Sequence, residues 1–159
     1  AGRIASGAPF AWRLDTARAL AGLSAPLSWM EAGEDDGPGH AHPAHPALWG
    51  DVILARRDTP ASYHLSVVLD DADQKITDVI RGQDLFEATA IHRLLQELLG
   101  LRAPVYRHHR LVVDEAGRKL SKSDADTALS ALRAAGRDAG EVSRMAGIGT
   151  ELRPFASPA

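Results

Sequence analysis

The chain of 159 residues contains no cysteine, which excludes a disulfide framework and a thiolate metal site. It also lacks any apolar run long enough to cross a bilayer. Its first residues, Ala1–Ala5, do not form the apolar stretch of a signal peptide. The net charge of -3 gives no overall attraction to nucleic acid, so any contact with RNA requires a local basic patch. These absences predict a globular protein without membrane contact.

The composition supports one domain with a proper core, because 45% of the residues are apolar and 25% are charged. The pattern changes near residue 47. Residues 1–47 are uneven: a strand-like stretch at 10–14 and a short helix at 16–23 precede a turn-rich insert at 30–46. This insert has an acidic half and a His/Pro half, and we expect it to be a mobile surface loop that buries little.

Residues 48–123 carry stronger periodicity. Short apolar runs predict strands at 52–54 and 76–80, whereas Tyr63–Leu69 fits either a strand or a buried helix. The remaining expected elements are extended segments at 104–108 and 111–113, and helices at 124–135 and 138–146 in a short helical segment, 124–159.

Apolar residues recur at helical spacing from Ile91 to Leu99. Thr89 is the expected N-cap of this helix, and Gly100 is its expected stop. The order strand, helix, strand predicts a βαβ unit in an α/β fold, with a parallel sheet covered on both faces.

Two basic features follow predicted strands. Lys119-Leu120-Ser121-Lys122-Ser123 is a loop whose ammonium and hydroxyl groups suit a polyphosphate, although a solvated basic turn has the same composition. Arg81 ends the strand at 76–80, where a guanidinium can hold a carboxylate in a two-pronged pair. The alternative for Arg81 is a salt bridge to Asp78, Asp84 or Glu87. Ligands bind beyond the carboxyl ends of parallel strands, so we expect both features at one edge of the sheet.

The ordered motifs around these features resemble the second half of the Rossmann-like catalytic domain of class I glutamyl-tRNA synthetases. The similarity is dense from Leu48 to Asp124, and its segments are Gly50–Ile53, Tyr63–Ala72, Val79–Leu85, Pro104–His108 and Lys119–Ser123. Within the family, the short chain length after Ser123 favours the subfamily that attaches glutamate to the queuosine base of tRNA(Asp). The resemblance implies a cytoplasmic ligase that uses glutamate, ATP with Mg2+ and tRNA(Asp), and that works as a monomer.

The resemblance also implies roles for individual residues. Tyr63 and Arg81 match residues that bind the glutamate substrate. Lys122 matches the second lysine of the signature loop, which contacts ATP, and Lys119 is the other catalytic candidate. Leu120, Ser121 and Ser123 complete the expected ATP-binding loop. A buried core tyrosine is the alternative for Tyr63.

Several family features are missing. The chain has neither the His-x-Gly-His-like nucleotide motif nor the cysteines that bind zinc in the full family enzyme. We therefore expect the C-terminal part of a longer enzyme, inactive when isolated, with residues 1–47 following the missing zinc module. His64 stands where the family usually has glutamine or asparagine.

Two further interpretations remain open at this point. The chain can be a fragment of a discriminating glutamyl-tRNA synthetase, or a non-catalytic half-domain that binds nucleotide or RNA. The histidines of the insert, His40, His42 and His45, are potential metal ligands, but the flexible composition around them argues against a metal site. We expect no metal ligands in this chain.

Overall fold

The computed structural model describes residues 9–33, 37–114, 117–120 and 128–147. The chain divides into two compact units, Ala1–His109 and Arg110–Ala159. The first unit contains both sheets and the longer helices, and it carries the site described below.

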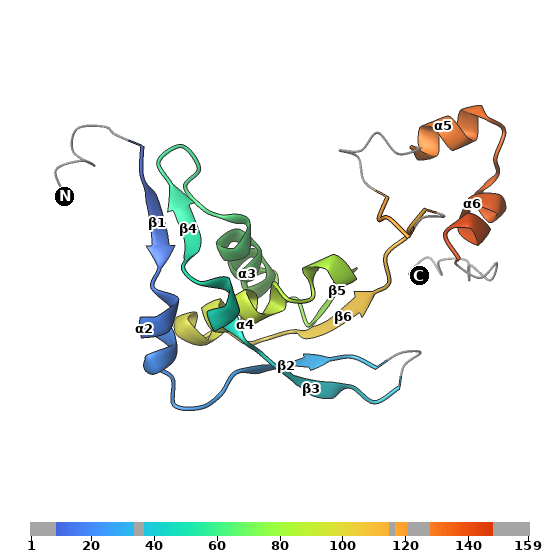
Figure 1. Ribbon diagram of the computed structural model, residues 1–159. Coiled ribbons are helices and arrows are strands. Elements are labelled where there is room, and N and C mark those ends of the chain that lie inside the picture. Colours follow the sequence, from blue (N-terminus) through green and yellow to red (C-terminus); the bar gives the residue numbers. More distant parts are fainter. Residues whose placement is uncertain (1–8, 34–36, 115–116, 121–127, 148–159) are drawn as a thin grey trace. The chain divides into compact units, whose positions relative to one another are not determined.

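A four-stranded sheet with the order β3-β2-β6-β5 is the frame of the first unit (Figure 1). Its strands are β2 (Ser28–Glu31), β3 (His40–Pro43), β5 (Asp78–Gly82) and β6 (Val105–His109). Strands β2, β6 and β5 run parallel, and β3 joins the edge antiparallel to β2. The sheet is therefore mixed, and the predicted α/β class with a βαβ unit is confirmed.

The predicted loop at 30–46 is wrong in part, because residues at the start of this range and near its end belong to the sheet. Met30 and Glu31 belong to β2, and His40–Pro43 forms β3 opposite them. Glu31 is only 8% exposed. Proline and histidine near an edge strand read as loop composition, but an edge strand tolerates proline because one side of its backbone needs no ladder partner.

Helix α4 (Thr89–Leu99) connects β5 to β6 and supplies the centre of the core. Ala90 and Leu94 pack with Trp29 and Tyr106 on the sheet side. Ile91 and Leu95 pack instead with Val52 and Val68. Both Ile91 and Leu94 are 0% exposed, so this helix is apolar on two faces.

The ends of α4 test two predictions. Gly100 ends the helix in the left-handed region at φ 66°, as expected, and its N–H bonds the carbonyls of Gln96 and Glu97. The N-cap is Ala88 rather than Thr89, which lies inside the first turn. The Thr89 hydroxyl is therefore available to a neighbouring side chain.

The ambiguous run at 63–69 is helical. Helix α3 (Tyr63–Asp73) begins at Ser62, whose hydroxyl accepts a hydrogen bond from the backbone N–H of Leu65. The strand before it, β4 (Val52–Arg56), pairs antiparallel with β1 (Ala11–Leu14). The other short elements of this unit are α2 (Thr16–Ala21), η2 (Pro46–Trp49) and η3 (Gln83–Leu85).

Helices do not cover both faces of the sheet within the described residues. Met30, Ile80 and Val105, from three neighbouring strands, are 45%, 67% and 37% exposed. Alternation along each strand places these side chains opposite the core face. The expectation of a sheet covered on both faces is wrong for the described residues of the first unit.

The second unit contains α5 (Leu129–Ala134) and α6 (Ala139–Met145). The second helix has the reciprocal capping box of Asp138 and Glu141. Residues 111–113 form no strand beyond an isolated bridge between Val113 and Lys119, so that predicted strand is wrong. Among the described residues, no helix is long and apolar enough to cross a membrane.

Candidate functional site

Each of the three parallel strands places an apolar and then a polar side chain on the core face. The pairs are Trp29 and Glu31 on β2, Tyr106 and His108 on β6, and Val79 and Arg81 on β5. The register sets Arg81 opposite His108, and Glu31 opposite Tyr106. The polar residues thus form a row near the carboxyl ends of the strands, where open parallel sheets bind ligands.

Arg81 is held by three side chains. Its Nε donates to His108 Nε2 at 3.1 Å, and one terminal nitrogen donates to His92 Nδ1 at 3.0 Å. The other terminal nitrogen donates to Thr89 Oγ1. The guanidinium carbon also lies 5.1 Å from the centre of the Tyr106 ring. These contacts fix the plane of the guanidinium.

None of the anticipated salt bridges of Arg81 to Asp78, Asp84 or Glu87 is present among the described residues. A guanidinium has five N–H groups, and three are used. One N–H on each terminal nitrogen therefore has no partner in the described part of the chain. Two such donors suit one carboxylate.

Arginine can only donate, and this fixes the protonation of the histidines around it. His108 accepts at Nε2, so its proton is on Nδ1 and points to Glu31, whose two oxygens lie at 3.0 and 2.9 Å. His92 accepts at Nδ1, so its proton is on Nε2 and points to His64 Nδ1 at 3.0 Å. His64 therefore carries its proton on Nε2.

The pKa values of these three histidines are all lowered, which agrees with neutral rings. Burial, and then the charge of Arg81, lowers the pKa of His92 to about 3 and moves the pKa of His64 in the same direction. The pKa of His108 is also lowered by burial, although the hydrogen bond that it donates to Glu31, and the charge of Glu31, oppose this shift. Glu31 also accepts hydrogen bonds from Trp29 Nε1 at 3.0 Å and from the backbone N–H of His108 at 2.9 Å.

Tyr63 lies next to His92, which also contacts Arg81. Its ring centre is 5.8 Å from that of His92 and 5.4 Å from that of His64. The side chain is 54% exposed, so the alternative of a buried core tyrosine is wrong. The structure therefore brings together the two residues expected to bind glutamate, Tyr63 and Arg81, around His92.

The lysine loop is only partly described. Ser121, Lys122 and Ser123 lie outside the described residues. Lys119 and Leu120 belong to the second unit, where the backbone N–H of Leu120 bonds the carbonyl of Val112 at 3.1 Å. The expected convergence of this loop with Arg81 therefore stays a prediction.

Sequence reasoning did not identify Thr89 or His92 as partners of Arg81, or Glu31 as the partner of His108. The available signal was the i, i+3 spacing of Thr89 and His92, which places two polar groups on one side of the helix. Glu31 gave no such signal, because its acidic neighbours suggested a loop.

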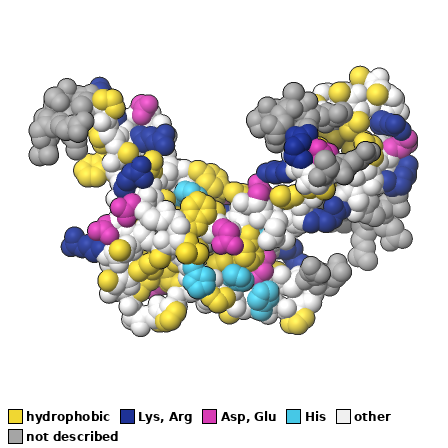
Figure 2. Space-filling model, viewed as in Figure 1, with side chains coloured by type: hydrophobic (Ala, Val, Ile, Leu, Met, Phe, Trp, Pro, Cys, Tyr) yellow, Lys and Arg dark blue, Asp and Glu magenta, His cyan; other side chains and the backbone are white. Residues whose placement is uncertain are grey.

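The insert histidines have packing contacts. The His42 ring stacks on Trp29 with 4.4 Å between centres, and Figure 2 shows histidine side chains gathered over the region of β2 and β3. No group of three or more histidine, cysteine or acidic side chains suited to a metal ion occurs among the described residues. The described residues therefore do not fit the zinc site expected of the full family enzyme.

The class of the protein follows from this fold and from comparison with known families. Residues 43–147 match the family "tRNA synthetases class I (E and Q), catalytic domain", and the chain belongs to this family.

Individual proteins with similar sequences include two glutamyl-Q tRNA(Asp) synthetases. A glutamyl-Q tRNA(Asp) synthetase of Rhodobacter capsulatus is 51% identical over 129 residues, covering 77% of this chain and 46% of that protein. The protein of the same name from Leptothrix cholodnii is 47% identical over 123 residues, covering 77% of this chain and 39% of its own length. The chain thus spans less than half the length of these relatives.

A solved structure supports the fold. The glutamate-tRNA synthetase of Elizabethkingia anophelis is 27% identical, with a TM-score of 0.58. The match covers 79% of this chain and 23% of that one. The α/β fold of a class I catalytic domain is confirmed.

Proposed function

We propose that the protein carrying this chain activates glutamate with ATP and transfers it to the queuosine base of tRNA(Asp). The observation that carries this proposal is the Arg81 guanidinium, held on three sides with one N–H of each terminal nitrogen unpartnered. This arrangement suits a carboxylate, and Tyr63 supplies an exposed hydroxyl and ring beside it. The relatives named glutamyl-Q tRNA(Asp) synthetase support the choice of tRNA.

In the proposed first step, the glutamate carboxylate attacks the α-phosphorus of ATP, which enters with Mg2+, and pyrophosphate leaves. Arg81 holds a carboxylate of the amino acid, and Tyr63 packs beside its aliphatic stem. Lys122 and Lys119 would offset the charge on the phosphates, with Leu120, Ser121 and Ser123 shaping the loop. Positioning and charge stabilisation dominate such a step. The protein would act in the cytoplasm as a monomer.

The amino-acid role of Arg81 is tested by glutamate-dependent exchange of pyrophosphate into ATP. Arg81→Lys in the complete protein keeps the charge but loses the planar fork. We expect the KM for glutamate to rise by about 10- to 100-fold, in line with the loss of a charge-assisted hydrogen bond or two, with a smaller change in the KM for ATP. An unaltered glutamate dependence would contradict the assignment.

The role of Lys122 is tested in the same assay. Lys122→Ala should reduce the exchange rate at saturating glutamate far more than it changes the KM for glutamate, since the ammonium stabilises charge that develops on the phosphates. An unchanged exchange rate would exclude this role.

The nucleic-acid substrate requires a separate measurement. Transfer of labelled glutamate should occur to tRNA(Asp) that contains queuosine, and not to tRNA(Asp) lacking queuosine or to tRNA(Glu). Charging of tRNA(Glu) instead would favour the second candidate, an ordinary glutamyl-tRNA synthetase like the similar solved structure. Absence of exchange and of transfer would leave a non-catalytic nucleotide- or RNA-binding module.

A further inference from the structure

A cavity lies beside the Arg81 site, and Arg81 does not line it. It encloses 480 Å³ between η2, strands β1 and β4, and the start of α3. A cavity of this size is within the range of small-ligand sites. His64 contacts both places, because it lines this cavity and accepts the hydrogen bond from His92.

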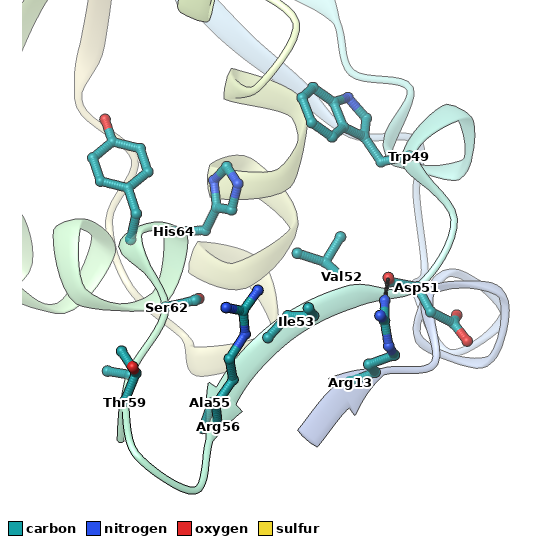
Figure 3. Close-up of a pocket in the computed structure, with 12 residues that line it drawn as sticks. Arg13, Trp49, Asp51, Val52, Ile53, Ala55, Arg56, Thr59, Ser62 and His64 are labelled. Atoms are coloured by element: carbon teal, nitrogen blue, oxygen red, sulfur yellow. Dashed lines mark hydrogen bonds between the residues drawn. The ribbon is translucent and has the colours of Figure 1, made fainter. Parts of the chain in front are cut away.

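The charged groups that line the cavity are mostly basic. Arg56 reaches from the end of β4 into the space below His64 (Figure 3), and its side chain has no hydrogen bond or ion pair to any described residue. Arg13 donates to the backbone carbonyl of Asp51 at 3.1 Å. The Asp51 carboxylate turns away from the cavity and accepts from the backbone N–H of Thr16 at 3.2 Å. The acid that lines the cavity therefore does not offset Arg56.

Aromatic rings form the opposite wall. Trp49 is 45% exposed, and its only ring contact among the described residues is an edge contact with His64 at 6.1 Å between centres. Part of the indole is therefore accessible to a planar ligand. Tyr63 lines the same cavity and is 54% exposed.

His64 adds a donor. Since Arg81 fixes the proton of His92 on Nε2, the Nδ1 of His64 must accept, and the Nε2 of His64 must carry a hydrogen. This N–H has no partner among the described residues. The cavity thus offers an unpaired cation, a neutral N–H donor and exposed rings, which together suit a ligand that has a phosphate and a planar base with acceptor atoms.

We propose that this cavity binds one nucleotide of single-stranded RNA, with its base stacked on Trp49 and its phosphate on Arg56, and with His64 Nε2–H donating to an acceptor of that nucleotide. The proposal deepens the proposed function, on which it rests: the nucleotide lies next to the amino-acid site because His64 separates the cavity from His92 and Arg81. The net charge of -3 makes such a local basic site necessary for contact with RNA.

The test is binding of a fluorescein-labelled, single-stranded RNA hexamer of mixed sequence to the complete protein, followed by anisotropy. Trp49→Ala is expected to weaken binding by about 5- to 100-fold, and Trp49→Phe to restore most of it, because one stacked base has this value. Arg56→Gln should weaken binding and lower the slope of log K against log salt by about 0.7, as for one lost phosphate contact. His64→Ala should weaken binding less than Trp49→Ala.

Two matched variants control for surface effects. Trp12 is 58% exposed and Arg102 is exposed, and neither lines the cavity. Trp12→Ala and Arg102→Gln should leave RNA binding unchanged. Equal losses in Trp49→Ala and Trp12→Ala, or an unchanged salt slope in Arg56→Gln, would overturn the proposal.

Three further outcomes separate this proposal from its alternatives. Competitive displacement of the hexamer by ATP, with equal loss of both ligands in Arg56→Gln, would assign the cavity to ATP and overturn the RNA assignment. Glutamate-dependent pyrophosphate exchange by the unsubstituted protein, together with no effect of Trp49→Ala on RNA, would remove the cavity proposal and leave the activation step standing. Absence of exchange, with RNA binding that depends on Trp49 and Arg56, would remove the ligase and keep the RNA site.

Discussion

The surroundings of Arg81 and the cavity lined by Arg56 lie next to His64, yet the two arginines differ in their hydrogen bonds. Arg81 is half-buried and makes three hydrogen bonds to neutral side chains of β6 and α4. Arg56 is exposed and its guanidinium bonds no described residue. The first arrangement fixes an orientation, whereas the second leaves a cation available to a ligand.

This difference has an energetic consequence. Buried polar groups without partners are costly, so residues that hold Arg81 contribute to folding as well as to binding. Arg56 and Trp49 of the cavity are exposed, and their removal leaves no buried group unpaired. Variants in the Arg81 network should therefore change stability, and variants of Arg56 and Trp49 should not.

Acid should break the network most strongly. Burial lowers the pKa of His92 to about 3, and the charge of Arg81 acts in the same direction, as do His64 and His108. The unfolded chain has the ordinary value of 6.5, so below this pH it binds a proton that the folded chain excludes. The contribution of His92 is complete above pH 6.5 and is lost as the pH falls towards 3, by roughly 4 kcal/mol.

Urea unfolding between pH 7.5 and pH 4 measures this loss. The control is His92→Gln, which removes this titrating group and should reduce the pH dependence to the part that His64 and His108, whose pKa values are also lowered, contribute. Identical pH profiles for the two proteins would show that His92 does not carry the effect.

Glu31→Ala should have the next largest effect. The substitution removes the acceptor for Trp29 Nε1 and for both the ring and backbone N–H of His108. Leaving these donors without a partner should lower the free energy of unfolding by about 3 kcal/mol. Glu31→Gln keeps an acceptor oxygen and should recover part of this loss.

Glu97 is a control for Glu31, because it is also a glutamate that accepts a hydrogen bond from a side chain but its own side chain is more exposed. The Glu97 side chain is 43% exposed and pairs with Arg93 at 2.6 Å, so Glu97→Ala should cost less than about 1 kcal/mol. Similar losses for Glu31→Ala and Glu97→Ala in urea unfolding would mean that the carboxylate of Glu31 supports nothing beyond an ordinary surface pair.

Thr89→Val is a smaller change of nearly the same shape. It removes the acceptor for one terminal nitrogen of Arg81 and should cost about 1 kcal/mol of stability. The freed guanidinium should also bind glutamate less tightly, because its plane is less restricted. Calorimetric titration with glutamate measures this effect, and equal affinity for the parent and Thr89→Val would show that His92 and His108 suffice to orient Arg81.

Cavity variants should have the smallest effect on stability. Arg56→Gln and Trp49→Phe should each change the free energy of unfolding by less than about 0.5 kcal/mol, because both side chains are exposed. A loss of 2 kcal/mol or more in urea unfolding would show that Arg56 or Trp49 supports the fold, and the contrast with Arg81 would fail.

Sequence patterns predicted the elements that depend on local signals. The apolar spacing from Ile91 to Leu99 and the stop at Gly100 gave α4, and the flanking apolar runs gave β5 and β6 to within about two residues. The position of Arg81 at the end of β5 followed from the same pattern. These features are set by neighbours in the chain.

Features that depend on distant residues were not predictable in the same way. Tyr63–Leu69 is too short for periodicity to separate a helix from a strand, and only packing of Val68 against Ile91 decides it. Glu31 looked like part of an acidic loop because its partners, Trp29 and His108, come from two different strands. Burial of a polar residue is a property of the assembled sheet.

The central claim is that Arg81 sets the tautomers of His108, His92 and His64. The positions of the histidine protons test this claim most directly. Long-range ¹⁵N–¹H NMR at pH 7.5, assigned with single His→Gln variants, distinguishes a protonated ring nitrogen from a bare one. We predict a proton on Nδ1 of His108 and on Nε2 of both His92 and His64. A proton on Nδ1 of His92, or a doubly protonated His92 at this pH, would contradict the account.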